Sequence, residues 1–93
     1  MEDQTRQLIC VVDDERTNAL MLSMMLETDF EVCVAYTGLG AIDMVRQRKP
    51  DLVLLDIVLP DLNGYEVCAK LKEDPVTSDI PVIFVTGLED SEN

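Results

Sequence analysis

The most informative run of the sequence lies near its amino terminus: Leu8-Ile9-Cys10-Val11-Val12-Asp13-Asp14. An unbroken row of apolar residues, rich in β-branched side chains, is typical of a strand that is buried on both faces of a parallel sheet. Two aspartates follow the apolar row directly. The run therefore predicts a buried strand with carboxylates at its carboxyl end.

Outward from this run, short apolar segments alternate with segments of helix length. Further strands are predicted over residues 31–35, 51–55 and 80–85, and helices over residues 16–28, 41–48 and 65–73. Each connection between strands is long enough for a crossover helix, so the strands should be parallel with right-handed crossovers. We predict an α/β fold with a doubly wound parallel sheet, formed by a single domain over residues 1–93.

Two local features have more than one interpretation. The segment Thr37-Gly38-Leu39-Gly40 indicates a tight turn rather than a phosphate-binding loop, because it lacks the full glycine pattern after the first strand. Met21, Met24 and Met25 are expected in the core rather than on a recognition surface. However, Ser23 is the only polar residue between positions 19 and 26, which is few for an amphipathic surface helix.

The composition excludes several classes of function. The chain has 93 residues, 19 acidic against 7 basic, and a net charge of −12. Without a cluster of lysine and arginine, binding to nucleic acid or to an anionic membrane surface is not expected. No apolar run approaches the roughly 20 residues of a membrane span, and no signal peptide is recognisable, so we expect a cytoplasmic protein.

The residues available for catalysis and metal binding are restricted. The sequence has no histidine, which excludes histidine-based triads and histidine-rich zinc sites. Cys10, Cys33 and Cys68 form no C-x-x-C motif and are expected to be buried, reduced thiols.

Three aspartates stand at predicted strand ends. Asp13 and Asp14 follow the first strand, and Asp56 ends the third. If these strands are neighbours, the carboxylates meet at the edge where open parallel sheets bind ligands. Such a cluster is unfavourable unless a cation is bound or pKa values rise, and oxygen-only ligands select Mg²⁺ or Mn²⁺. For Asp14 alone, a helix N-cap is the simpler interpretation.

Several short motifs follow one another between residues 8 and 87: Val11-Val12-Asp13-Asp14, Ala35 to Gly38 and Ala41-Ile42, Pro50 to Asp56, Leu59-Pro60, Gly64-Tyr65-Glu66-Val67, and Ile80-Pro81-Val82-Ile83 to Thr86-Gly87. Together they resemble the receiver domain of two-component response regulators. The stretch from Leu71 to Pro81 looks most like receivers fused to cyclic-di-GMP output domains.

The resemblance implies a flavodoxin-like fold and a signalling function rather than an enzyme. Asp56 would accept a phosphoryl group from a phosphohistidine of a sensor kinase or a histidine phosphotransfer protein. Mg²⁺, or Mn²⁺ as the alternative, would be held by Asp13, Asp14, Asp56 and the backbone carbonyl of Val58. In the family, the first helix helps to dock the phosphodonor.

The resemblance also assigns residues around the phosphoryl group. Thr86 would supply the switch hydroxyl that donates to a phosphoryl oxygen, and Gly87 would leave room for the group. Val58 and Leu88 would flank the path of the hydrolytic water. Since apolar side chains cannot orient a water molecule, we expect a long-lived phosphoryl group.

The family pattern continues with a further helix, a fifth strand and a last helix, which this chain lacks. That strand carries a lysine that binds the phosphoryl group and an aromatic switch residue. A pseudo-receiver that acts only as a protein-interaction module is therefore the alternative function. Because the fourth strand would be an open edge, we also expect this chain to self-associate.

A haloacid-dehalogenase-type phosphatase would need Asp-x-Asp after the first strand, and a flavodoxin-like electron carrier would need a phosphate loop there.

Overall fold

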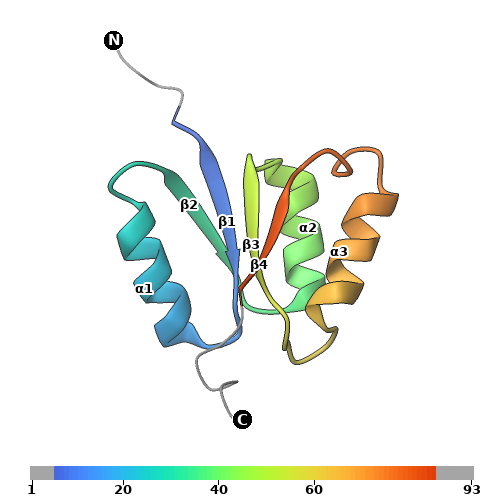
Figure 1. Cartoon of the computed structure of the whole chain (residues 1–93), viewed down its shortest axis with the longest axis horizontal. Coiled ribbons are helices and arrows are strands. Elements are labelled where there is room, and N and C mark those ends of the chain that lie inside the picture. Colours follow the sequence, from blue (N-terminus) through green and yellow to red (C-terminus); the bar gives the residue numbers. More distant parts are fainter. Residues whose placement is uncertain (1–5, 86–93) are drawn as a thin grey trace.

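The computed structural model describes residues 6–85 and shows a parallel sheet between two layers of helices (Figure 1). Its elements, in chain order, are β1 (Leu8–Val12), α1 (Arg16–Leu26), β2 (Glu31–Ala35), α2 (Gly38–Arg48), β3 (Leu52–Asp56), α3 (Gly64–Glu73) and β4 (Val82–Val85). The strands lie in the order β2-β1-β3-β4, and every pair is parallel. This confirms the predicted doubly wound, flavodoxin-like fold.

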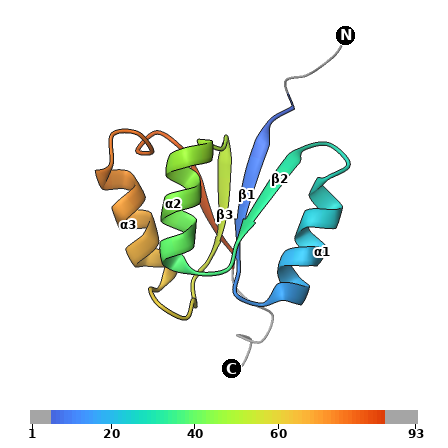
Figure 2. The ribbon, with the colours of Figure 1, turned by 180° about the vertical axis from the view of Figure 1, so that it is seen from behind.

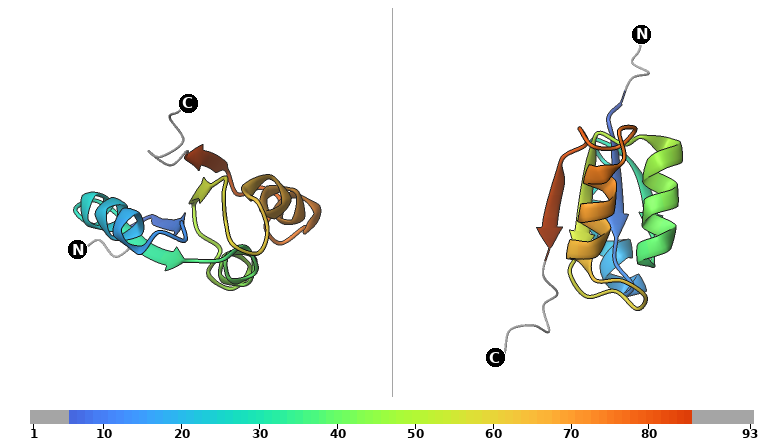
Figure 3. Two further views of the ribbon diagram at one scale, coloured as in Figure 1. Left: turned by 90° about the horizontal axis from the view of Figure 1, so that it is seen from below. Right: turned by 90° about the vertical axis from the view of Figure 1, so that its right-hand side faces the viewer.

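The two faces of the sheet bury different residues. Cys10 of β1 lies opposite Cys33 of β2 and Val53 of β3, and these side chains pack in the core beneath α2 and α3. The alternate residues Ile9 and Val11 face the other way and pack with α1. Figures 2 and 3 show this division, with α1 on one side of the sheet and α2 and α3 on the other. Because both faces of β1 are covered, its apolar row is continuous.

The predicted turn at residues 37–40 is wrong, because α2 already begins at Gly38. Thr37 is the N-cap residue, and its side-chain oxygen accepts the backbone N–H of Gly40. The two glycines therefore lie in the first turn of the helix. β1 and β2 match the predicted bounds, and the remaining elements differ from theirs by one or two residues.

The prediction that the methionines of α1 lie in the core is also wrong. Met21, Met24 and Met25 are exposed, and Met25 keeps 71% of its surface accessible. The residues of α1 that are buried are the small ones, Ala19 and Ser23. Small side chains let the helix approach the sheet closely, which leaves the long side chains on the outer face.

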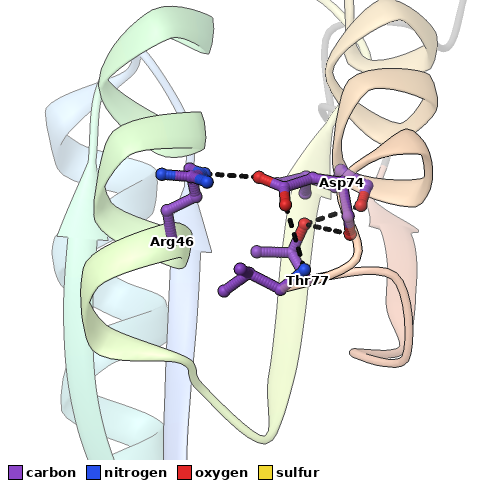
Figure 4. Close-up of polar contacts among 5 residues, drawn as sticks. Arg46, Asp74 and Thr77 are labelled. Atoms are coloured by element: carbon purple, nitrogen blue, oxygen red, sulfur yellow. Dashed lines mark hydrogen bonds and ion pairs between the residues drawn. The ribbon is translucent and has the colours of Figure 1, made fainter.

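The connection from α3 to β4 is held by polar contacts (Figure 4). Thr77 is fully buried, and its hydroxyl donates to the carbonyl of Leu71 at 2.6 Å. Asp74 accepts the backbone N–H of Val76 at 2.9 Å and forms an ion pair with Arg46 of α2. These contacts satisfy backbone groups at the end of α3 and tie it to α2.

The cysteines are free thiols, and two of the three are buried as predicted. Cys10 and Cys33 lie in the core, whereas Cys68 is only half-buried. Hydrogen bonding with Cys33, together with burial, raises the pKa of the Cys10 thiol. In the part of the chain that the structure describes, no helix is long and apolar enough to cross a membrane.

Candidate functional site: an acid cluster at the carboxyl edge of the sheet

The three predicted aspartates lie together at the carboxyl ends of β1 and β3. These strands are adjacent, with Val12 opposite Leu55, so the residues that follow Val12 meet Asp56 at one edge of the sheet. One carboxylate oxygen from each of Asp13, Asp14 and Asp56 lies within 4.8 Å of the other two. The convergence predicted from the strand ends is confirmed.

The turn after β1 fixes Asp13 and leaves Asp14 at the surface. Asp13 is buried; its N–H donates to the carbonyl of Ala35 at 3.1 Å, and its Oδ1 accepts the N–H of Glu15 at 2.9 Å. Glu15, not Asp14, is the N-cap residue of α1. The interpretation of Asp14 as a helix cap is therefore wrong, and its exposed carboxylate faces the cluster without that structural role.

Asp56 is a nearly buried carboxylate, with 7% of its surface exposed. Burial is the main cause that raises the pKa of Asp56, and the charges of Asp13 and Asp14 raise it further. Backbone N–H groups of Val58 and Ile57 act in the opposite direction. Because the charged form is disfavoured overall, the site favours a bound proton or a bound cation at Asp56.

The donor set fits a hard divalent cation. It consists of carboxylate oxygens alone, two of them from buried residues and one from an exposed residue that can stay in contact with water. Mg²⁺ prefers such oxygen ligands and keeps several of its waters. The guanidinium of Arg16 lies 4.0 Å from the centre of the Tyr36 ring and stacks on its face.

The loop between β3 and α3 starts at the cluster and folds back on itself. The N–H of Gly64 donates to the carbonyl of Ile57 at 2.7 Å, which closes the loop at its base. A Cβ atom on Gly64 would lie 2.5 Å from the carbonyl oxygen of Asp56, so only glycine permits this closure. Val58 lies within the loop; the residue is 63% exposed, and its backbone nitrogen lies 3.4 Å from Asp56 Oδ1.

One residue of this loop was not identified from the sequence. The carboxylate of Asp61 accepts the N–H groups of Gly38 and Leu39, at the start of α2. The available signal was weak: α2 has no acid in its own first turn, so its amides need an acceptor from elsewhere in the chain.

The remaining predicted site residues, Thr86, Gly87 and Leu88, lie outside the described residues. Their roles stay predictions from the resemblance.

Comparison with known proteins identifies the family. The model of the response regulator receiver domain matches residues 9–93. Over 93 residues, all of this chain and 21% of the relative, the chain is 41% identical to a probable cyclic di-GMP phosphodiesterase of Vibrio cholerae. It is also 42% identical over 82 residues to the response regulator PleD of Caulobacter vibrioides, covering 87% of this chain and 18% of the relative.

A solved structure supports the same family assignment. The crystal structure of the N-terminal domain of a response regulator receiver protein from Methanoculleus marisnigri is 34% identical, with a TM-score of 0.82, over 86% of this chain and 66% of that one. The chain spans only about a fifth of the two sequence relatives, so their remaining domains say nothing of its own activity. With the family model, these matches show that the chain belongs to the response regulator receiver domain family.

Proposed function

We propose that this chain receives a phosphoryl group on Asp56 in a reaction that depends on Mg²⁺. Receiver domains are signalling domains and not catalysts of a separate reaction, and they interact with phosphodonor proteins. The observation that carries the proposal is the cluster of three carboxylates within 4.8 Å of one another, with Asp56 nearly buried among them. A pseudo-receiver would have no need of such a cluster.

In the proposed reaction, an oxygen of the Asp56 carboxylate forms a bond to phosphorus as the bond from phosphorus to the donor histidine nitrogen breaks. That nitrogen keeps the electron pair, and because the other ring nitrogen of the donor carries a proton, the ring leaves as a neutral imidazole. Phosphoryl transfer requires mainly alignment and neutralisation of charge. Asp14, Asp56 and the carbonyl of Val58 would hold a Mg²⁺ ion, with Asp13 acting through water, and the ion would supply that neutralisation.

The resemblance supports further roles around Asp56. Thr86 donates its hydroxyl to a phosphoryl oxygen, and Gly87 leaves space for the group. Val58 and Leu88 flank the path of the hydrolytic water and slow the loss of the phosphoryl group. The exposed side chain of Val58 is in keeping with this role.

The proposed phosphodonor is a histidine kinase or a histidine phosphotransfer protein that docks on α1. The outer face of this helix is apolar and exposed, with Leu20, Met21, Met24 and Met25 at its surface. Flexible methionines suit a surface that adapts to a partner helix.

The net charge of −12 argues against nucleic acid as a partner of this segment. Free thiols favour the cytoplasm as its compartment.

We further propose that residues 1–93 form one domain and that this chain self-associates. In the described sheet, β4 is an edge strand. Its residue Ile83 is 51% exposed, and Phe84 is partly exposed beside Tyr65. An exposed apolar strand edge is a template for pairing with a second chain. Light scattering over a concentration series tests this, and a single monomeric mass at all concentrations would contradict it.

The phosphoacceptor proposal is tested by intact mass spectrometry after incubation with acetyl phosphate. We expect one phosphoryl group on the wild type, only with a divalent cation, and none on Asp56→Asn. Asp51→Asn is the matched control, because Asp51 lies before β3 and accepts the N–H of Leu8 at the opposite edge of the sheet. Equal modification of Asp56→Asn and the wild type would refute the site, and an unmodified wild type would favour the pseudo-receiver.

A further inference from the structure

The loop between β3 and α3 is anchored to the start of α2 by Asp61. Asp61 Oδ1 lies 2.7 Å from the backbone nitrogen of Gly38, and Oδ2 lies 2.9 Å from that of Leu39. Oδ1 also accepts the N–H of Leu62 at 2.9 Å. A single carboxylate therefore joins two segments that are 22 or 23 residues apart in the sequence.

The anchor satisfies groups that α2 cannot satisfy itself. The first N–H groups of a helix have no partner within the helix, and the positive end of its dipole favours an acid. The side chain of Thr37 accepts the N–H of Gly40, and the carboxylate of Asp61 accepts the N–H groups of Gly38 and Leu39. Hydrogen bonds from the amides of Leu39 and Gly38 are the main cause that lowers the pKa of Asp61, so the carboxylate is charged at neutral pH.

The contact is also close-packed. A Cβ atom on Gly38 would lie 2.9 Å from Cβ of Leu62, 3.0 Å from the side chain of Val67 and 3.1 Å from Asp61 Oδ1. The loop thus rests directly on the backbone at the start of α2, with room for a glycine only. Leu59 and Leu62 of the loop pack against the core on the same side.

The anchor lies three residues after Val58. On one side of Val58, the chain is fixed in β3 by the pairing of Asp56 with Val85. On the other side, Asp61 holds it to α2, and the N–H of Gly64 closes the loop onto Ile57. The backbone at Val58 therefore has little freedom to move away from the acid cluster while Asp61 stays bound.

We propose that Asp61 is a positioning residue for the metal site: it fixes the β3–α3 loop on α2 so that the carbonyl of Val58 is held at the carboxylates. The inference rests on the proposed function, since it assumes that Val58 contributes a ligand. It also couples the start of α2 to the metal site, because the carboxylate of Asp61 contacts both the start of α2 and the loop that carries Val58.

The test compares Asp61→Asn and Asp61→Ala with Asp74→Asn. Asp74 is a suitable control because its carboxylate likewise accepts a backbone N–H, that of Val76, and pairs with Arg46, but it lies at the opposite end of α2 and α3 (Figure 4). Mg²⁺ affinity is measured by isothermal titration calorimetry on chains shown to be folded by circular dichroism. The rate of labelling by acetyl phosphate is then measured against Mg²⁺ concentration.

Loss of a group that orients a metal ligand typically weakens metal binding by about 10–100-fold. We expect a loss of at least about tenfold in Asp61→Ala, a smaller loss in Asp61→Asn, and a change within about twofold in Asp74→Asn. The labelling rate at saturating Mg²⁺ should recover in the Asp61 variants, because Asp56 itself is intact. A purely structural contact would not produce this separation of affinity from maximal rate.

The results that would contradict the inference can be told apart from those that would contradict the proposed function. Folded Asp61 variants that bind Mg²⁺ as the wild type does would overturn the inference and leave the proposed function standing. An equal loss of affinity in Asp74→Asn would overturn it as well, as would failure of both Asp61 variants to fold while Asp74→Asn folds. A wild-type chain that binds no Mg²⁺ would refute the proposed function, and this inference with it.

Discussion

Replacing Asp56 with asparagine should make the metal-free chain more stable. Two unit charges 4.8 Å apart repel by about 0.9 kcal/mol in water and by about 3.5 kcal/mol at an effective dielectric constant of about 20, and the oxygens of Asp13, Asp14 and Asp56 lie within 4.8 Å. Asp13 is buried and Asp14 is exposed, so the repulsion from Asp13 dominates. Asparagine keeps an oxygen that accepts the N–H of Val58. We expect a net gain of about 1–3 kcal/mol in the free energy of unfolding.

The gain should depend on pH. Burial and the neighbouring carboxylates raise the pKa of Asp56, so the folded chain binds this proton more tightly than the unfolded chain does. In the wild type, the resulting stabilisation is complete below the unfolded pKa of about 3.9 and is lost as pH rises through the folded pKa. Asp56→Asn has no such proton, so its advantage should be largest at neutral pH and should vanish in acid.

Urea unfolding followed by circular dichroism, with EDTA present, measures the difference at neutral and acidic pH. A gain of 1 kcal/mol corresponds to a rise in Tm of about 4–8 °C for a domain of this size. Mg²⁺ at ten times its Kd should stabilise the wild type by about 1.4 kcal/mol and the variant by less.

The sign of the effect is the decisive result. In the control Asp74→Asn we expect a loss of stability at neutral pH, because contact with Arg46 lowers the pKa of Asp74. If Asp56→Asn were instead less stable than the wild type at neutral pH without Mg²⁺, the reasoning from charge repulsion would be refuted.

Three further predictions concern single side chains. Thr77→Val should lower the free energy of unfolding by about 1–3 kcal/mol, because the carbonyl of Leu71 loses a buried hydrogen bond, whereas Thr77→Ser should keep most of the stability in the same urea titration. Gly64→Ala should weaken Mg²⁺ binding and slow labelling by acetyl phosphate, since its Cβ would lie 2.5 Å from the backbone oxygen of Asp56; unchanged titration and labelling would contradict the close packing. Val58→Asn should shorten the lifetime of the phosphoryl group, and an unchanged rate of decay would show that position 58 does not control the hydrolytic water.

The strands and the acid cluster were predictable because local sequence determines them. An unbroken apolar row such as that of β1 has few alternatives to a strand covered on both faces. Once the strands are parallel and β1 lies beside β3, the residues that follow them must meet at one edge, as Asp13 and Asp56 do.

The errors arose where distant residues decide the structure. The segment at residues 37–40 looked like a turn because its glycines are poor helix formers, but Asp61 supplies two acceptors from 22 and 23 residues away and so allows α2 to start at Gly38. In α1 the sequence is apolar nearly all round, so periodicity could not show which face meets the sheet. The choice follows from packing, which buries Ala19 and Ser23 and exposes the methionines.

The distribution of positive charge separates most of the basic side chains from the acid cluster. Six of the seven basic residues lie at the amino end of the sheet: Arg6 before β1, Arg46, Arg48 and Lys49 at the end of α2, and Lys70 and Lys72 at the end of α3. There they interact favourably with the carboxyl ends of the helices.

The seventh basic residue, Arg16, is at the carboxyl edge but stacks on Tyr36. In a parallel α/β fold, helices end where strands begin, so the basic residues that favour helix ends are kept a full strand length from the carboxylates at strand ends. The same rule that stabilises α2 and α3 therefore leaves Asp13, Asp14 and Asp56 without a side-chain cation from the described residues. Carboxylates that lie this close together without a side-chain cation are the arrangement that favours a bound divalent ion, as the proposed function requires.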